Sequence, residues 1–211
     1  MDRSYRVPYG QETLHFELPE SVEIEILEPA IVPAAGDPQA AVEAALEAPL
    51  GGVSLDGYRG AQSAAIAISD KTRPVPHHDL LPPLLRRLVD LGLSHTDIHI
   101  LIATGLHERM KPAEYGAILP PEILAQYPVD CHSADAQENL VWLGETRRGT
   151  PVWVNRSFME ADLRLVVGDI EPHQFQGFSG GVKSAAIGLA GRDTINANHS
   201  MMDDPGARMI F

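Results

Sequence analysis

Cysteine is almost absent from this sequence, and so are long apolar runs. The 211 residues contain one cysteine. A single cysteine excludes an intramolecular disulfide and a cysteine-rich metal site, and it fits a reducing compartment. No apolar run approaches the roughly 20 residues of a membrane-spanning helix, and the N-terminus has no signal-peptide core. We therefore expect a globular, cytoplasmic protein.

Basic residues are also scarce. Lys and Arg number 16 against 29 Asp and Glu, which gives a net charge of −13. This balance argues against nucleic acid and against an anionic membrane surface as partners, since both need clustered cations. An acidic protein can still bind a small anion where a few cations and backbone N–H groups converge.

The length predicts one good-sized domain rather than two. The last residues, 203–211, are apolar at the end and lack the polar composition of a natural tail. We expect residues 1–211 to be a single domain taken from a longer protein.

Strand patterns alternate with helix patterns after an N-terminal segment at 12–28 that reads as a β-hairpin. Buried strands are predicted at 64–69, 97–102 and 163–168, a hairpin at 139–154, and helices at about 37–47, 78–91, 111–117, 120–126 and 182–189. This alternation predicts an α/β fold with a mostly parallel sheet flanked by helices.

Polar segments follow the three predicted buried strands, at 70–73, 103–107 and 169–173. In α/β sheets, ligands bind beyond the carboxyl ends of the parallel strands. We therefore expect these three segments to line one rim of the sheet.

A glycine-rich segment, 177–184, reads GFSGGVKS. Glycines let the backbone approach a ligand closely, and a following helix presents free N–H groups. The segment departs from the phosphate loop of nucleotide-binding enzymes because Val182 separates Gly181 from Lys183. The other interpretation is a tight turn; Lys183 and Ser184 favour an anion site.

Three of the nine histidines lie near the predicted rim: His107, His173 and His199. Imidazole titrates near neutral pH and is a common metal ligand, so the group suits acid/base work or metal binding. It lacks the spacing of a zinc protease, and we interpret the other six histidines as ordinary. Arg73 can clamp a carboxylate or phosphate and Asp70 can orient a partner, although a strand-end ion pair explains both equally well.

These segments resemble a known family in order and spacing. SDKTRPVP, ATGLHE and EPHQFQGFSGGVKSAAIGLAGRDTINANH are similar to the N-terminal domain of the lactate racemase family, and the resemblance runs from about Tyr9 to His199. It implies a nickel pincer nucleotide, a pyridinium mononucleotide whose thio groups hold nickel.

The resemblance also implies a role for each matching position. Lys183 matches the lysine that carries the cofactor covalently, and His199 matches the nickel-coordinating histidine. The loop from Gly177 through Gly180 to Gly181, with Ser184, matches part of the cofactor cradle. Catalysis is implied for the pair His107 and His173, as acid and base, and substrate binding for Arg73 and Asp70.

The implied reaction is racemisation of lactate or a related 2-hydroxy acid by hydride transfer. The implied partners are cofactor-synthesis proteins and a C-terminal domain that closes over the site, so the domain alone is expected to be cofactor-free and poorly active when made without them. Two other functions stay open from the residues: a nucleotide-dependent phosphotransferase using the glycine-rich loop, and a non-catalytic module that binds an anion.

Overall fold

The computed structural model describes residues 4–28, 30–173 and 177–203, and its contacts divide the chain into two compact units, residues 1–35 and 36–211. Each unit is described separately.

The first unit contains an antiparallel hairpin of β1 (Ser4–Tyr9) and β2 (Glu12–Glu17). Gly10 turns the chain with a φ of +61°, a conformation that glycine adopts without strain. An N-terminal hairpin is therefore confirmed, but the predicted range of 12–28 is wrong. The strand that pairs with β2 precedes it, and residues 18–28 form neither helix nor strand.

The second unit alternates strands and helices. Its strands are β3 (Ala64–Ser69), β4 (Ile98–Ala103), β5 (Val129–Cys131), β6 (Leu140–Glu145), β7 (Pro151–Asn155), β8 (Leu163–Val167), β9 (Pro172–His173) and β10 (Gly177–Phe178). Its α-helices are α1 (Pro38–Glu47), α2 (His77–Asp90), α3 (Pro121–Gln126), α4 (Arg156–Glu160), α5 (Gly181–Ala186) and α6 (Arg192–His199), with short 3₁₀ helices that include Pro112–Ala117.

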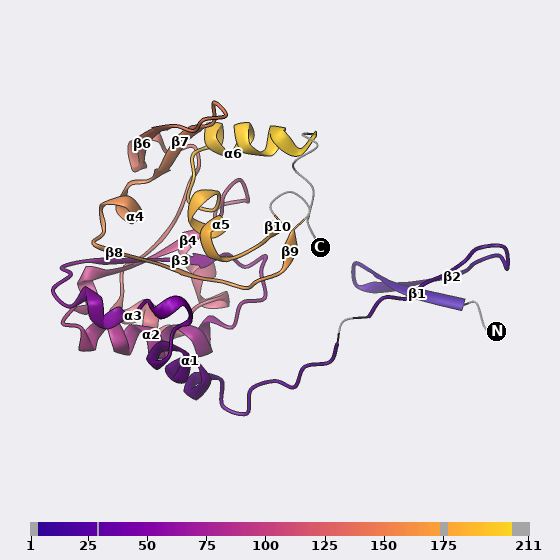
Figure 1. Ribbon diagram of the computed structural model, residues 1–211, viewed down its shortest axis with the longest axis horizontal. Helices are drawn as coiled ribbons and strands as arrows, with labels where there is room; N and C mark the ends of the chain where they lie inside the picture. Colours follow the sequence, from indigo (N-terminus) through magenta and orange to yellow (C-terminus); the bar gives the residue numbers. More distant parts are fainter. Residues whose placement is uncertain (1–3, 29, 174–176, 204–211) are drawn as a thin grey trace. The chain divides into compact units, whose positions relative to one another are not determined.

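The central sheet has the order β5–β4–β3–β8, and all its strands are parallel. Helices α1, α2 and α3 lie on one side of it, while α4, α5 and the β6–β7 hairpin lie on the other (Figure 1). This arrangement confirms the predicted α/β class. It also places the carboxyl ends of β3, β4 and β8 along the same edge.

The central strand β3 contributes side chains to two hydrophobic clusters, one on each face of the sheet. Its six residues, AAIAIS, are all buried. Ile66 and Ile68 pack with apolar side chains of α2, and Ala67 packs on the opposite face with Leu101 and Phe158. Because successive side chains of a strand point to opposite faces, a short run of apolar residues can serve two layers at once.

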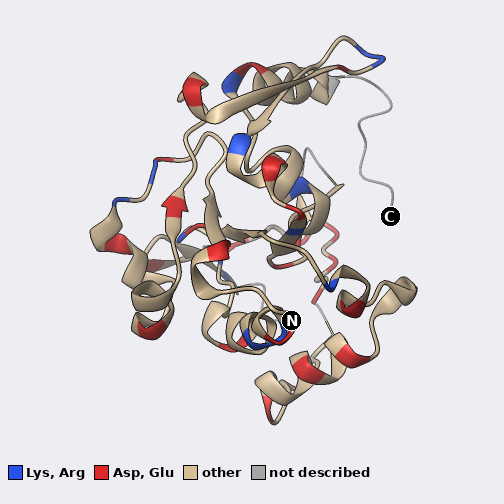
Figure 2. Cartoon of the chain, turned by 90° about the vertical axis from the view of Figure 1, so that its left-hand side faces the viewer, with Lys and Arg blue, Asp and Glu red and all other residues tan. Residues whose placement is uncertain are grey.

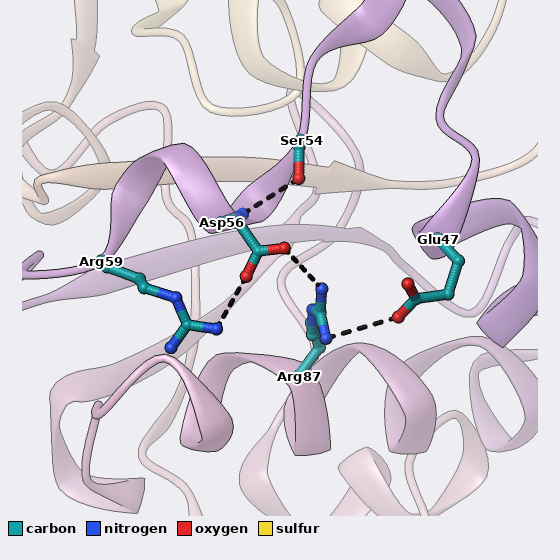
Figure 3. Close-up of polar contacts among 5 residues, drawn as sticks. All are labelled: Glu47, Ser54, Asp56, Arg59 and Arg87. Carbon is teal, nitrogen blue, oxygen red and sulfur yellow. Dashed lines mark hydrogen bonds and ion pairs between the residues drawn. The ribbon is translucent and has the colours of Figure 1, made fainter.

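Helix α1 begins as the sequence predicts and is joined to α2 by ion pairs. Asp37 caps it by accepting a hydrogen bond from the Ala40 N–H at 3.0 Å. Arg87 of α2 contacts Glu47 at 3.4 Å and Asp56 at 2.9 Å (Figure 3). The acidic partners are exposed, so these pairs contribute little to the stability of the fold.

Several elements were not predicted from the sequence, among them β5, α4 and α6. The predicted helix at 182–189 is α5, which ends at Ala186, and a separate helix, α6, carries His199 as its last residue. The sequence of α6, RDTINANH, has few apolar residues and so gives no periodic signal.

Acidic residues are spread over many elements of the second unit, with basic residues between them (Figure 2). Among the described residues, no helix has both the length and the apolar character needed to cross a membrane.

Candidate active site at the carboxyl ends of three strands

A cavity of about 320 Å³ lies at the carboxyl ends of β3, β4 and β8. Most of the predicted site residues line it: Asp70, Arg73, His107, His173, Gly180, Lys183, Ser184 and His199. Gly177 and Gly181 belong to the same loop but do not line the cavity. The residues between His173 and Gly177, which are part of the recognised motif, lie outside the described residues, as do 204–211.

The segment after β3 holds a buried carboxylate. Asp70 is 3 % exposed. Its Oδ1 accepts hydrogen bonds from the Thr72 backbone N–H at 2.9 Å and from Thr72 Oγ1 at 2.5 Å. Its Oδ2 lies 2.7 Å from His107 Nδ1. Burial alone would raise the pKa of Asp70, but the hydrogen bonds from Thr72 and His107 outweigh it and hold the pKa below its usual value.

His107 is therefore oriented by a carboxylate. An ionised Asp70 can only accept a hydrogen bond, so this contact forms when Nδ1 carries the proton, and the Nε2 lone pair is then the proton acceptor. The side chain is 48 % exposed and lines the cavity. The segment that carries His107 is held to the residues after α5, because the Gly105 N–H donates a hydrogen bond to Gly188 O at 2.9 Å. This arrangement suits a general base.

The glycine loop is tied to the segment after β8. The Ser179 N–H donates to Glu171 O at 2.8 Å, and the Ser179 hydroxyl donates to Asp169 O at 3.2 Å. Gly180 has φ +69° and ψ −168°, and a Cβ there would lie 2.0 Å from Asp169 O. No other residue fits, so the backbone of the loop is pressed against the end of β8 and places Lys183 at the cavity.

Lys183 has an amine suited to act as a nucleophile. Its side chain is partly buried, and burial is the main cause that lowers its pKa below the usual range; the nearby charge of Arg73 lowers it further. Asp169 and Asp70 oppose this shift with their negative charges. The neutral amine is consequently more populated than in a solvent-exposed lysine.

His173 and His199 come from two different elements. His173 ends β9, and its pKa is lowered by burial first and then by the charges of Lys183 and Arg73. His199 ends α6, whose first turn is fixed by a bidentate ion pair between Arg192 and Asp135 at 2.6 and 2.8 Å.

Buried polar contacts support the start of α6. His132, one of the six histidines interpreted as ordinary, is buried, and its Nε2 lies 2.9 Å from Ala190 O. Asn155 Nδ2 lies 3.3 Å from His132 Nδ1. The neutral ring, whose pKa burial lowers, links β5 to the residue before Gly191. His132 is therefore a structural residue.

Sequence reasoning missed two residues at the site, Asp169 and Thr72. Asp169 lines the cavity, and both of its carboxylate oxygens are buried with no hydrogen-bond partner among the described residues. Its position directly beyond β8 was the available signal. Within residues 4–28, 30–173 and 177–203, no group of three His, Cys, Asp or Glu side chains is arranged to hold a metal.

Comparisons with known proteins agree with the motifs. The family model described as "Lactate racemase N-terminal domain" matches residues 9–209. A lactate racemase of Lactiplantibacillus plantarum is 38% identical over 173 residues, which are 81% of this chain and 41% of the relative. A lactate racemase of Thermoanaerobacterium thermosaccharolyticum is 35% identical over 211 residues, 96% of this chain and 48% of the relative. The chain thus spans less than half the length of these curated relatives.

Solved structures share the fold. The lactate racemase apoprotein from Thermoanaerobacterium thermosaccharolyticum superimposes with a TM-score of 0.84 at 33% identity, covering 97% of this chain and 48% of that chain. A structural-genomics protein from Thermotoga maritima has a TM-score of 0.65 at 22% identity and covers 83% and 45% of the two chains. The second likeness concerns the fold alone.

Proposed function

This chain belongs to the lactate racemase N-terminal domain family, and we propose that it is the cofactor-binding part of a racemase or epimerase of lactate or a related 2-hydroxy acid. The observation that supports this most directly is the cavity. It is lined by three histidines, one lysine and one arginine that come from separate segments: His107, His173, His199, Lys183 and Arg73. The rest of the proposal, including a C-terminal domain that completes the site and a cytoplasmic location, follows from the family.

The residues at the cavity fit a nickel pincer nucleotide. Lys183 would hold it covalently, through an amine whose lowered pKa favours the nucleophilic form. Gly180 and Ser184 both line the cavity and would border the cofactor. His199 would supply the protein ligand to nickel. When bound, the cofactor would accept a hydride from the substrate carbon and return it.

Arg73 would bind the substrate carboxylate. It lines the cavity and has no ion-pair partner among the described residues, so its planar fork of donors is available to an anion. A fixed carboxylate leaves the rest of the 2-hydroxy acid to be oriented by the walls of the site.

Cofactor-synthesis proteins and the C-terminal domain are the partners that the proposed racemase would require.

His107 and His173 would act as the acid/base pair. One imidazole takes the hydroxyl proton of the bound 2-hydroxy acid, and the other returns a proton to the oxygen of the flat 2-keto acid. Two proton-transfer groups suit a racemase because the two enantiomers present their hydroxyl groups differently. Asp70 holds His107 by its Nδ1 and stabilises the imidazolium that forms.

The test is the full-length protein produced together with the cofactor-synthesis proteins. We expect a mass increment on the peptide that contains Lys183, bound nickel, and racemisation of a 2-hydroxy acid. Replacement of His107 or His173 with alanine should abolish racemisation. His15→Ala, in β2 and not among the residues that line the cavity, should not.

Two outcomes would contradict the proposal. Racemisation by protein with an unmodified Lys183 would exclude the covalent cofactor. Tight binding of ATP–Mg²⁺ that is lost in Lys183→Ala, without racemisation, would favour a phosphotransferase instead.

A further inference from the structure

We propose that Thr72 is a positioning residue that fixes the ring of His107 in the tautomer with its proton on Nδ1. Thr72 follows Asp70 in the segment beyond β3 and touches both members of the Asp70–His107 pair. The use of this tautomer in catalysis rests on the proposed function; the tautomer itself does not, and it can be measured in the isolated chain.

The contacts of Thr72 fix the carboxylate of Asp70 in one orientation. The end of an aspartate side chain turns easily, because the torsion next to a carboxylate has a broad and shallow profile. Two donors from Thr72, the backbone N–H at 2.9 Å and Oγ1 at 2.5 Å, hold the same oxygen, Oδ1. The other oxygen, Oδ2, is therefore directed to His107 Nδ1 at 2.7 Å.

Counting hydrogens then decides the role of Nδ1. A threonine hydroxyl has one hydrogen, and the short contact with Asp70 Oδ1 uses it. Thr72 Oγ1 also lies 3.4 Å from His107 Nδ1. At that contact the hydroxyl has only lone pairs to offer, so both polar neighbours of Nδ1 are acceptors. A neutral imidazole can satisfy them only with its proton on Nδ1, and Nε2 is then the basic nitrogen.

Removal of the hydroxyl should weaken this selection. In Thr72→Val the carboxylate keeps the backbone donor but loses the hydroxyl donor, so it can turn away from His107. The pKa of Asp70 should rise toward its usual value, because the Thr72 hydrogen bond is the largest of the effects that lower it. Thr72→Ser retains the hydroxyl and should restore both effects.

The experiment uses the 211-residue chain labelled with ¹⁵N-histidine, in long-range ¹H–¹⁵N spectra recorded above the pH range in which imidazoles titrate. The His107 signals are assigned by their loss in His107→Gln. We expect the Nδ1–H form of the wild type in about tenfold excess or more, as a hydrogen bond to a charged acceptor implies. In Thr72→Val the excess should fall by about two- to tenfold. Thr72→Ser and Thr13→Val, the latter in β2, should match the wild type.

Several results would overturn the proposal. A wild-type His107 with its proton mainly on Nε2 would do so without any variant, even if Thr72→Val does not fold. An unchanged tautomer ratio in a folded Thr72→Val, or a Thr72→Ser that behaves like valine, would also overturn it. In the full-length, cofactor-loaded protein, Thr72→Val should lower kcat more than it changes KM. If the wild type shows no racemisation, the proposed function fails while the tautomer result stands.

Discussion

Alanine at Gly180 tests whether the glycine loop is held by steric contact with the end of β8. The backbone there has φ +69° and ψ −168°, a conformation that is essentially restricted to glycine. The added Cβ would meet Asp169 O at 2.0 Å, so the two backbone segments would have to move apart. Conformational strain costs about 1–3 kcal/mol. With the displacement added, we expect the free energy of unfolding to fall by about 2–4 kcal/mol.

Gly181→Ala is the matched control. Gly181 also has a positive φ, +50°, but a Cβ there would meet nothing within 4 Å. Its substitution should cost about 1–2 kcal/mol from backbone conformation alone. Urea denaturation gives both free energies. For a protein of this size, the Gly180 variant should also melt roughly 4–16 °C below the wild type.

The reasoning fails if the two variants are equally stable, because the close approach to Asp169 would then carry no energetic weight. A second readout is local. The Gly180 variant should shift the backbone amide resonances of Asp169 and Lys183, which the loop brings together, whereas the Gly181 variant should leave Asp169 unchanged.

Three further predictions concern the core and the titrating groups. Ile68→Ala, at a fully buried position of β3, should lower the free energy of unfolding by about 2–5 kcal/mol in urea denaturation. Burial lowers the pKa of His77 to about 4 in the folded protein. Because this value lies below the unfolded value of about 6.5, the free energy of unfolding should decline as the pH falls from 6.5 to 4, by up to about 3 kcal/mol. A folded His77→Phe with the same decline would refute that assignment. Reductive ¹³C-methylation followed by NMR titration should show Lys183 losing its proton at lower pH than Lys71, whose pKa the hydrogen bond to Glu114 raises; the reverse order would contradict the burial argument.

The sequence predicted the elements whose signal is local. The buried run AAIAIS gave β3 with the observed bounds, and Asp37 followed by Pro38 marked the start of α1. Both depend on neighbouring residues alone, through burial on two faces and through capping. The polar segments beyond the strands indicated one rim, since parallel strands end at the same edge of a sheet.

Elements without a local signal could not be found in this way. Helix α6 has a polar sequence, and its first turn is held by Asp135, 57 residues earlier in the chain. The hairpin prediction paired the wrong segments because alternation marks a strand but does not choose its partner, which the turn at Gly10 decides.

The candidate site also has features that the sequence determines and features that depend on the tertiary structure. By itself, the sequence determined which residue types stand beyond β3, β4 and β8, and the length of its motifs determined the family they resemble. Only the tertiary structure decided that Asp70 faces His107, that Thr72 holds both, and that Gly180 presses on Asp169. Those contacts join residues separated in the chain, and their distances set the proton positions and pKa values that residue order does not encode.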